Sequence, residues 1–431
     1  MRKNDRNMCW KIMFAGMSTM LIFAGCGDKK EDMTGQFEIV GESIDPSTEA
    51  VPEEERTDLD EAEVMFPADE DAPDVGQEKK QDDTIKNLGN YSVTIPKSWL
   101  EKSLIEEFAD TSANGEAWGY TFFCKEAADA DMGGFLFALG NYTDPRDFIQ
   151  LPSYQYLGTL QQEDQVLYIV AEYPTDVQFD EASSASYMEM QQQIDGILQS
   201  IHPKAGVNFS EERPKKLDAA IRRMEYVNAV ALLHFDGTMP DGSDAEDWDG
   251  DMSNDQYAIF DIDGDEKEEL IITIGDSYVA GMKEVIYEFD VTSGKMKKEV
   301  LLFPSATYFE NGTIQAFASH NQGLGGDFWP YEIYQYNSKT DTYDYIAYVD
   351  AWEKETFPES YDGKAFPEDI DADGNGYVYQ IYDSDYNGEG SWMDDPVFHT
   401  WLEQWIGSAK EIDFKRIDMT KENINQLLSE Y

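Results

Sequence analysis

The stretch of sequence that decides the fold of the C-terminal half reads YAIF at 257–260, DIDGDEKEE at 261–269 and LIITI at 270–274. The first and third segments are short, apolar and rich in aromatic and β-branched residues, which are features of β-strands. The middle segment is acidic at six of its nine positions. We therefore predict two strands joined by an acidic loop, within a domain rich in β-structure.

The acidic loop carries carboxylates at alternate positions, Asp261, Asp263 and Asp265. On a short loop this spacing turns several oxygen atoms toward one point, and a hard cation such as Ca²⁺ takes six to eight oxygen ligands. Carboxylates packed this closely repel one another, so a cation would neutralise them and order the loop. The residues favour a structural calcium site, and an acidic turn without metal is the alternative.

This loop resembles the D-x-D-x-D-x-x-x-[DE] calcium loops of EF-hands, of dockerins and of the FG-GAP repeats in integrin-like propellers. Its strand-like flanks fit the FG-GAP version better than the EF-hand, whose loop lies between helices. The resemblance implies a ligand set of four side chains and one backbone carbonyl. The side chains are those of Asp261, Asp263, Asp265 and Glu269, and the carbonyl is that of Lys267.

Two positions depart from these families. Glu266 stands where they usually have a glycine at a sharp turn, and Ile272 stands where an EF-hand has a bidentate glutamate. A turn relocated to Gly264 and a lowered affinity are both open interpretations. A second acidic loop, DIDADGNG at 369–376, is another candidate. Extracellular modules with few ligands typically bind Ca²⁺ at about 10⁻⁴–10⁻³ M, which suits a structural ion.

The N-terminus predicts an export signal. Four basic residues within positions 2–11 precede a mostly apolar run at 12–24, which is too short to span a bilayer as a stable helix. The run ends in LIFAGC at 21–26, which resembles the lipobox of bacterial lipoproteins. The resemblance implies that residues 1–25 are removed and that the Cys26 thiol takes a diacylglycerol, with fatty acyl chains such as palmitate. An ordinary secretory signal with a chance cysteine is the alternative.

The three cysteines agree with this interpretation. Cys9 leaves with the signal and Cys26 is acylated, so Cys124 remains alone and the mature chain has no intramolecular disulfide. Cys124 ends the strand-like run YTFFC at 120–124, which favours a buried, inert thiol over a nucleophile.

The composition excludes some partners. With 88 acidic and 32 basic residues, the 431-residue chain has a formal net charge of −56. Nucleic acid and anionic lipid both require a basic surface, so we expect no nucleic-acid partner and no adhesion to the membrane through a protein face. Apolar residues make up 41% of the chain, which is enough for packed cores in two domains of ordinary size. We expect a monomer.

The predicted order is a signal peptide at 1–25, an acidic disordered tether at 26–85, an α+β domain at 86–205 and a β-rich domain at 206–431. Residues 27–85 contain 21 acidic and five basic residues with no sustained apolar period, so like charges extend this segment. The tether would hold the folded part away from the membrane.

The first domain reads as strands followed by a closing helix. Strand-like runs lie at 91–95, 118–124, 134–139 and 165–173, and apolar spacings of three to four predict a helix at 183–201. This order predicts an α+β fold with an antiparallel sheet. The opening, a short strand followed by Pro96 and Trp99, resembles the start of the Mog1/PsbP-type α+β sandwich.

The second domain reads as a helix, many strands and two closing helices. We predict helices from Ser210 to about His234, from Pro396 and after Thr420, the second of them with Val397, Phe398, Trp401, Leu402 and Trp405 inward. Similar Ile-Tyr segments start at 286, 333 and 381, and the first two resemble the hairpin of a propeller blade. Three copies are too few for a closed propeller, so a twisted sheet or a partial blade stack is favoured.

Signatures of catalysis are mostly absent: the sequence has no H-E-x-x-H, no G-x-S-x-G, no phosphate loop and no Rossmann glycines. The arrangement of lipobox, tether, α+β domain and D-x-D-G-D loop resembles surface lipoproteins of Gram-positive bacteria. We therefore expect a non-catalytic, calcium-stabilised binding or structural protein, anchored through Cys26 on the extracytoplasmic face of the cell membrane. The alternatives are a carbohydrate- or solute-binding lipoprotein, using Trp329 or Trp352 against a cell-wall or glycan ligand, and an envelope or glycan hydrolase using His320.

Overall fold

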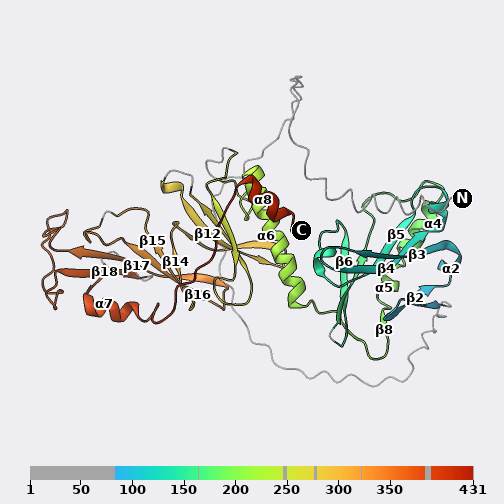
Figure 1. Ribbon diagram of the computed structural model, residues 1–431, viewed down its shortest axis with the longest axis horizontal. Helices are drawn as coiled ribbons and strands as arrows, with labels where there is room; N and C mark the ends of the chain where they lie inside the picture. The colour runs from blue at the N-terminus through green and yellow to red at the C-terminus, as the bar shows by residue number, and fades with distance from the viewer. Residues whose placement is uncertain are drawn as a thin grey trace, which may run out of the picture. The chain divides into compact units, whose positions relative to one another are not determined.

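The computed structural model describes residues 83–431 apart from 164, 246–249, 276–278, 322, 384–389 and 431 (Figure 1). All of the described residues belong to one unit of the chain, which begins at Gly76. The predicted signal peptide, the lipidation site Cys26 and nearly all of the predicted tether lie outside the described residues.

The first half of the described chain is built on two antiparallel sheets. The larger has the order β3-β4-β5-β7-β6-β9 and the smaller the order β1-β2-β8. The strands of the larger sheet are β3 (Ser103–Thr111), β4 (Glu116–Cys124), β5 (Phe135–Tyr142), β6 (Tyr154–Gln162), β7 (Gln165–Glu172) and β9 (Asn208–Ser210). Those of the smaller sheet are β1 (Asp83–Asn87), β2 (Tyr91–Pro96) and β8 (His202–Pro203). The helices are α2 (Trp99–Lys102), α3 (Lys125–Asp129), the 3-10 helix η2 (Pro145–Asp147), α4 (Ser184–Gln191) and α5 (Ile194–Leu198).

Trp99 is the centre of the core in this half. Its ring is fully buried and meets Phe122 and Phe137 edge-on, and those two rings stack with centroids 4.4 Å apart. The indole N–H donates to the side chain of Gln193 at 2.8 Å, so its one polar atom is satisfied. Cys124 is buried in the same core and is a free thiol, as its place in an apolar strand predicts.

The α+β class with antiparallel sheets is confirmed, and three details differ from the sequence-based expectation. Strand β1 begins at Asp83, inside the range assigned to the tether, and pairs with β2. The helix expected at 183–201 is two helices, α4 and α5; the second contains Gly196, a weak helix former. The sequence does not clearly predict strand β3. This strand lies at the edge of its sheet and most of its side chains are exposed, so it lacks the apolar pattern of a buried strand.

Helix α6 (Lys215–Asp236) opens the second half. It begins after Pro214, later than predicted, because Ser210 is already paired in strand β9. It ends at Gly237, whose φ of +69° suits a left-handed C-terminal cap. Leu217 packs with the first half of the chain, whereas Tyr226, Val230 and Leu233 pack on the sheet that follows.

That sheet has the antiparallel order β13-β12-β11-β10-β20. Its strands are β10 (Gln256–Phe260), β11 (Glu269–Ile274), β12 (Lys283–Asp290), β13 (Lys295–Leu302) and β20 (Ile417–Asp418), with the 3-10 helix η3 (Val279–Gly281) before β12. The predicted hairpin of two strands around the acidic loop is present as β10 and β11.

A second antiparallel sheet has the order β14-β15-β16-β17-β18-β19. Its strands are β14 (Thr307–Tyr308), β15 (Thr313–Phe317), β16 (Tyr331–Asn337), β17 (Thr342–Glu353), β18 (Tyr377–Asp383) and β19 (Ser391–Asp394). The three Ile-Tyr segments fall in β12, β16 and β18, so they are divided between the two sheets. A stack of blades would place each segment in a sheet of its own, but β16 and β18 share one sheet, so the partial blade stack is wrong.

The five-stranded sheet is covered on both faces. One face carries Tyr257, Ile272 and Tyr287 and packs against α6 and α8 (Lys421–Leu428). The opposite face carries Ala258, Ile271 and Ile286 and packs against residues of the second sheet. We call this opposite face the inter-sheet face. Because side chains alternate along a strand, the acidic residues of β12 at 284 and 288 lie on the inter-sheet face with Ile286.

The closing helices are α7 (Asp395–Leu402), which lies along the second sheet (Figure 1), and α8. Phe398 is buried in α7, but Val397, which was expected to point inward, is exposed. In α8, Thr420 caps the N-terminus by accepting from the backbone N–H of Asn423, and Ile424 and Leu427 are buried. Among the helices of the described residues, none combines the length and the apolar character needed to cross a membrane.

One buried charge on the inter-sheet face is fully partnered. The carboxylate of Glu284, with no exposed surface, accepts from two guanidinium nitrogens of Arg416 at 3.1 Å each. It also accepts from the hydroxyls of Tyr308 at 2.5 Å and Thr273 at 2.6 Å. Bidentate pairing and two further hydrogen bonds offset the cost of taking this charge out of water.

We expect Arg416→Ala to destabilise the protein by about 3 kcal/mol, because it leaves the Glu284 charge buried without a cation. Urea unfolding measures the change. Lys102→Ala is the control: Lys102 pairs with Glu189 at 2.7 Å, but both side chains are largely exposed, so its loss costs at most about 1 kcal/mol. Equal losses in the two variants would contradict the assignment.

Candidate metal centre

The acidic loop between β10 and β11 brings its three alternate aspartates together. Oxygen atoms of Asp261, Asp263 and Asp265 all lie within 4.8 Å of one another. The loop is closed by its own carboxylates, because Asp261 accepts from the backbone N–H of Gly264 at 2.8 Å and of Glu266 at 3.2 Å. Asp263 and Asp265 each accept from the residue two positions later, at 3.0 and 2.8 Å.

The sharp turn occurs at two positions of the loop. Gly264 has φ of +80° and Glu266 has φ of +73°. The glutamate therefore adopts the left-handed conformation that glycine adopts freely, at a cost of about 1–2 kcal/mol. The turn is retained at the position where the sequence departs from the calcium-loop families, and Gly264 adds a second turn before it.

Glu269 lies apart from the three aspartates. Its side chain is 1% exposed, and its carboxylate accepts from the backbone N–H of Ile262 at 2.8 Å. Burial, followed by the charge of Asp263, raises the pKa of Glu269 to about 10. The structure thus places Glu269 beside the loop, on the inter-sheet face, and outside the group of converging loop oxygens.

Lys267 contributes its side chain to a different contact. Its ammonium contacts Asp265 at 2.7 Å, Glu288 at 2.8 Å and Asp341 at 3.1 Å. Glu288 belongs to β12 and Asp341 to the turn between β16 and β17, so this one ammonium connects the loop to both sheets. Burial opposes its charge, but the three hydrogen-bonded carboxylates outweigh burial and raise the pKa of Lys267.

The electrostatics of the loop favour a bound cation. Burial and then the charges of Asp265 and Asp261 raise the pKa of Asp263 to about 7, because a second and third negative charge so close resist its ionisation. The converging donors are all carboxylate oxygens, which suit hard cations such as Ca²⁺ rather than Zn²⁺. Two oxygens on opposite sides of one Ca²⁺ are about 4.8 Å apart, so three loop aspartates fit such an ion.

The second acidic loop gains a carboxylate from outside itself. Asp371 and Asp373 lie within 4.8 Å of Asp394, the last residue of β19. One carboxylate oxygen of Asp371 and one of Asp394 are buried without a hydrogen-bond partner. The sequence indicated this loop but missed Asp394, because the pairing of β18 with β19 is what brings that residue to the loop.

The side chains considered for glycan binding and for hydrolysis differ in their exposure to solvent. Trp352 is 4% exposed and belongs to a buried cluster, so it is unable to form a binding rim. Trp329, in contrast, is 45% exposed, with its indole N–H donating to the carbonyl of Ala318. His320 is exposed, and its Nδ1 lies 2.8 Å from the hydroxyl of Ser319.

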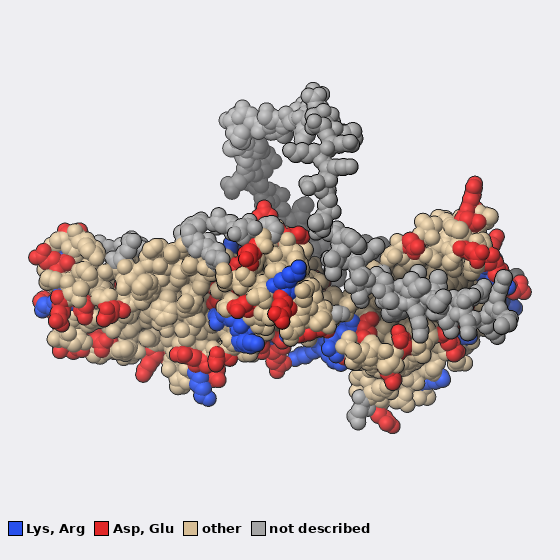
Figure 2. All heavy atoms as spheres, turned by 45° about the horizontal axis from the view of Figure 1, so that its top comes forward, with Lys and Arg blue, Asp and Glu red and all other residues tan. Residues whose placement is uncertain are grey.

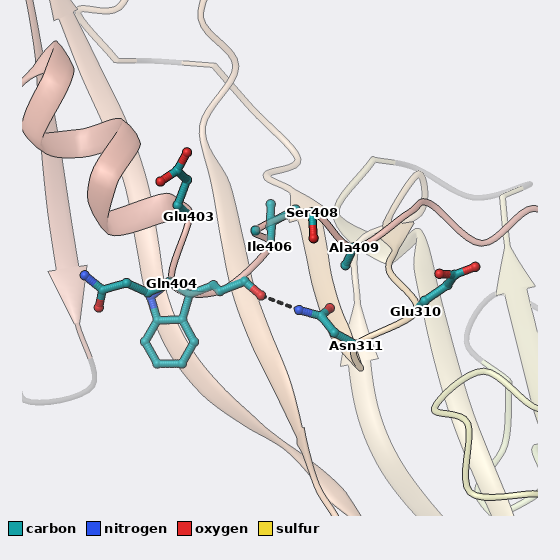
Figure 3. A pocket seen from close by; sticks show the side chains of 9 residues that line it. Glu310, Asn311, Glu403, Gln404, Ile406, Ser408 and Ala409 are labelled. Carbon is teal, nitrogen blue, oxygen red and sulfur yellow. Dashed lines mark hydrogen bonds between the residues drawn. The ribbon is translucent and has the colours of Figure 1, made fainter.

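A shallow pocket lies between the turn at 310–311 and the segment 403–409 after α7 (Figure 3). The amide of Asn311 donates to the backbone carbonyl of Trp405 at 2.6 Å and closes one side of it. Its two acidic residues, Glu310 and Glu403, lie at opposite ends of the lining in Figure 3. This lining holds no pair of groups that converges on a substrate atom.

Acidic side chains are spread over the whole face that Figure 2 shows, whereas Lys and Arg gather mainly near its middle. Exposed carboxylates alone therefore single out no site on the described part of this face. Carboxylates that converge and are buried are more informative. Such groups are present at the loop of β10 and β11 and at the inter-sheet face beside it.

Comparisons with family models, with curated proteins and with solved structures each find no match for this chain. The interpretation of its sites therefore depends on its own residues.

Proposed function

We propose that this protein is a lipid-anchored, extracytoplasmic binding or structural protein without catalytic activity, whose β-rich C-terminal half is stabilised by Ca²⁺. The observation that carries the proposal is the convergence of Asp261, Asp263 and Asp265 on one point of the loop between β10 and β11. A hairpin that joins an antiparallel sheet is a place where a bound ion stabilises the fold directly, since the ion binds only the folded loop.

The lipid anchor is proposed from the sequence. The segment LIFAGC at 21–26, after a basic start and an apolar run, supports cleavage before Cys26 and lipidation of its thiol. The acidic stretch that follows would keep the folded part away from an anionic membrane surface. For the first half, the opening in which β2 ends at Pro96 and Trp99 fills the core supports a Mog1/PsbP-type sandwich, which also remains a proposal.

Trp329 favours one alternative, a carbohydrate-binding lipoprotein. The Trp329 ring is exposed, and its indole N–H already donates to a backbone carbonyl. The exposed part of the ring is therefore available to stack on a sugar. If this alternative holds, a glycan array shows binding that Trp329→Ala abolishes. A comparable variant at Trp352 is no test, because that side chain is part of a buried cluster. A blank array would exclude this alternative for the glycans displayed.

We expect the full-length protein, purified in detergent, to bind Ca²⁺ at about 10⁻⁴–10⁻³ M and to melt at a higher temperature with Ca²⁺ than with EDTA. Asp261→Asn should weaken binding at the loop by about tenfold or more, because it removes a charged ligand while keeping a hydrogen-bond acceptor for the turn. Calorimetry and thermal melting measure both effects.

The matched control for this experiment is Asp290→Asn, in the turn between β12 and β13. Asp290 accepts from the backbone N–H of Thr292 at 2.9 Å, as a turn aspartate does, but belongs to no converging group of carboxylates among the described residues. The Asp290→Asn substitution should leave Ca²⁺ binding unchanged. Absence of any heat and of any melting shift at millimolar Ca²⁺ would overturn the calcium proposal.

We expect Cys26→Ala to abolish incorporation of a labelled palmitate analogue in a Gram-positive host and to move the protein from the membrane fraction to the medium. Cys9→Ala is the control, because Cys9 lies in the segment that is removed. Mass spectrometry of the mature N-terminus measures the same event directly. Retention at the membrane with no lipid on Cys26 would contradict the anchor.

A further inference from the structure

A β-bulge in strand β13 turns Glu299 into the protein. Ile286 of β12 pairs with Val300, and the next residue, Tyr287, pairs with Lys298, so Glu299 is an extra residue with no partner across the ladder. As a result Glu299 and Val300, which are neighbours in sequence, are both buried. Bulges of this kind redirect a side chain, and they occur often beside functional sites.

The glutamate that the bulge directs inward has an unsatisfied oxygen. Glu299 is 7% exposed, and its Oε2 is buried without a hydrogen-bond partner. The hydroxyl of Tyr343, on β17, is also buried without a partner, and this residue is 8% exposed. Tyr343 interacts electrostatically with Glu299 and with Asp263, so the two unsatisfied groups share one environment. Buried polar atoms almost always have a partner, and two without one in the same place indicate a missing ligand.

Three carboxylates from three separate segments converge here. Oxygen atoms of Asp263, Glu299 and Asp341 all lie within 4.8 Å of one another. They come from the loop between β10 and β11, from β13, and from the turn between β16 and β17. Lys297 holds that turn in place, because its ammonium donates to the backbone carbonyls of Thr340 at 2.7 Å and of Asp341 at 2.6 Å.

Two of these carboxylates form no ion pair with a lysine, although the charge of Lys297 acts on Glu299 at longer range. The Lys267 ammonium contacts Asp341 but neither Asp263 nor Glu299, and within the described residues no basic nitrogen lies within 4 Å of those two. Glu299 is nevertheless buried, and its Oε2 has no hydrogen-bond partner. The group therefore needs either a proton or a metal ion to neutralise it.

Glu284 shows what neutralisation by protein groups looks like on the same face. It is buried at least as deeply as Glu299, yet it accepts from Arg416, Tyr308 and Thr273. The fold thus supplies partners to a buried glutamate near the start of β12 and none to the Oε2 of Glu299, which lies opposite the middle of that strand. The contrast argues that the partner of Glu299 is not a side chain.

We propose that Asp263, Glu299 and Asp341 form an interior site for a hard divalent cation, with Ca²⁺ the best fit, and that this ion connects the two sheets of the C-terminal half. All three donors are carboxylate oxygens with the mutual spacing that Ca²⁺ requires. The buried hydroxyl of Tyr343, which has no hydrogen-bond partner, lies in the same environment as these carboxylates.

The interior site goes beyond the loop site of the proposed function and shares only Asp263 with it. Asp261 and Asp265 belong to the loop group, whereas Glu299 and Asp341 belong to the interior group. Variants of Asp261 and of Glu299 therefore test the two sites separately. An ion at the interior site would also explain why a strand, a loop and a turn distant in sequence each present an acidic side chain at one point.

The test is Glu299→Gln in the full-length protein in detergent, with Ca²⁺ titrated by calorimetry and melting recorded with Ca²⁺ and with EDTA. We expect loss of one Ca²⁺ binding event, or at least a tenfold fall in its affinity. In EDTA the variant should melt at the same temperature as the wild type or higher, because the amide removes a buried negative charge. Ca²⁺ should raise the melting temperature of the variant by less than it raises that of the wild type.

Glu284→Gln is the matched control, since it changes another buried glutamate on the same face. It should lower the melting temperature in EDTA by weakening the contact with Arg416, and leave the shift produced by Ca²⁺ unchanged. Asp341→Asn is the second variant of the site, and keeps the proposal testable if Glu299→Gln folds poorly. It should reproduce the loss of binding.

Each pattern of results decides between the two sites. Binding that is weakened by Glu299→Gln and Asp341→Asn but retained in Asp261→Asn supports the interior site and overturns the loop site. Binding weakened by Asp261→Asn alone overturns the interior site and means that Glu299 is held neutral by a proton. If the loop variant and the interior variants each lose a different Ca²⁺ binding event, both sites are supported. If the wild type binds no Ca²⁺, both sites are overturned.

Discussion

Neutralisation of buried carboxylates between the two sheets is the constraint on which the C-terminal half of this protein depends. The inter-sheet face carries Glu269, Glu284 and Glu288, and the bulge adds Glu299. Burial of an unpaired charge costs several kcal/mol, whereas a fully buried Ile or Leu contributes about 1.5–3 kcal/mol. One unneutralised glutamate therefore offsets two or three of the apolar side chains packed around it.

The protein meets this constraint in different ways along one face. Glu284 receives a guanidinium and two hydroxyls, and Glu288 receives the ammonium of Lys267. Glu269 accepts a backbone N–H from the loop. The same arrangement couples structure to the chemistry of the site, because Lys267 belongs to the acidic loop and its partners belong to both sheets. A change of charge in the loop therefore affects the packing between the two sheets.

Local sequence pattern predicted the elements but not the contacts between them. The strands around the acidic loop, the closing helices and the convergence of Asp261, Asp263 and Asp265 all follow from spacing within about fifteen residues. Asp341, Glu299 and Asp394 were missed, because their place depends on strand pairing between distant segments. The inward turn of Glu299 also depends on a bulge, which shifts the alternation of side chains by one residue and has no sequence signal of its own.

Helix α6 has a consequence for how the molecule unfolds. Its first turn supplies Leu217 to a cluster with Tyr142 and Phe148, and its later turns supply Tyr226 and Leu233 to the core of the five-stranded sheet. The domain boundary that composition places at 205/206 precedes a helix that belongs to two cores. Loss of the helix from either core removes apolar contacts from the other, so the two halves are thermodynamically coupled. Heating should then produce a single cooperative transition rather than two.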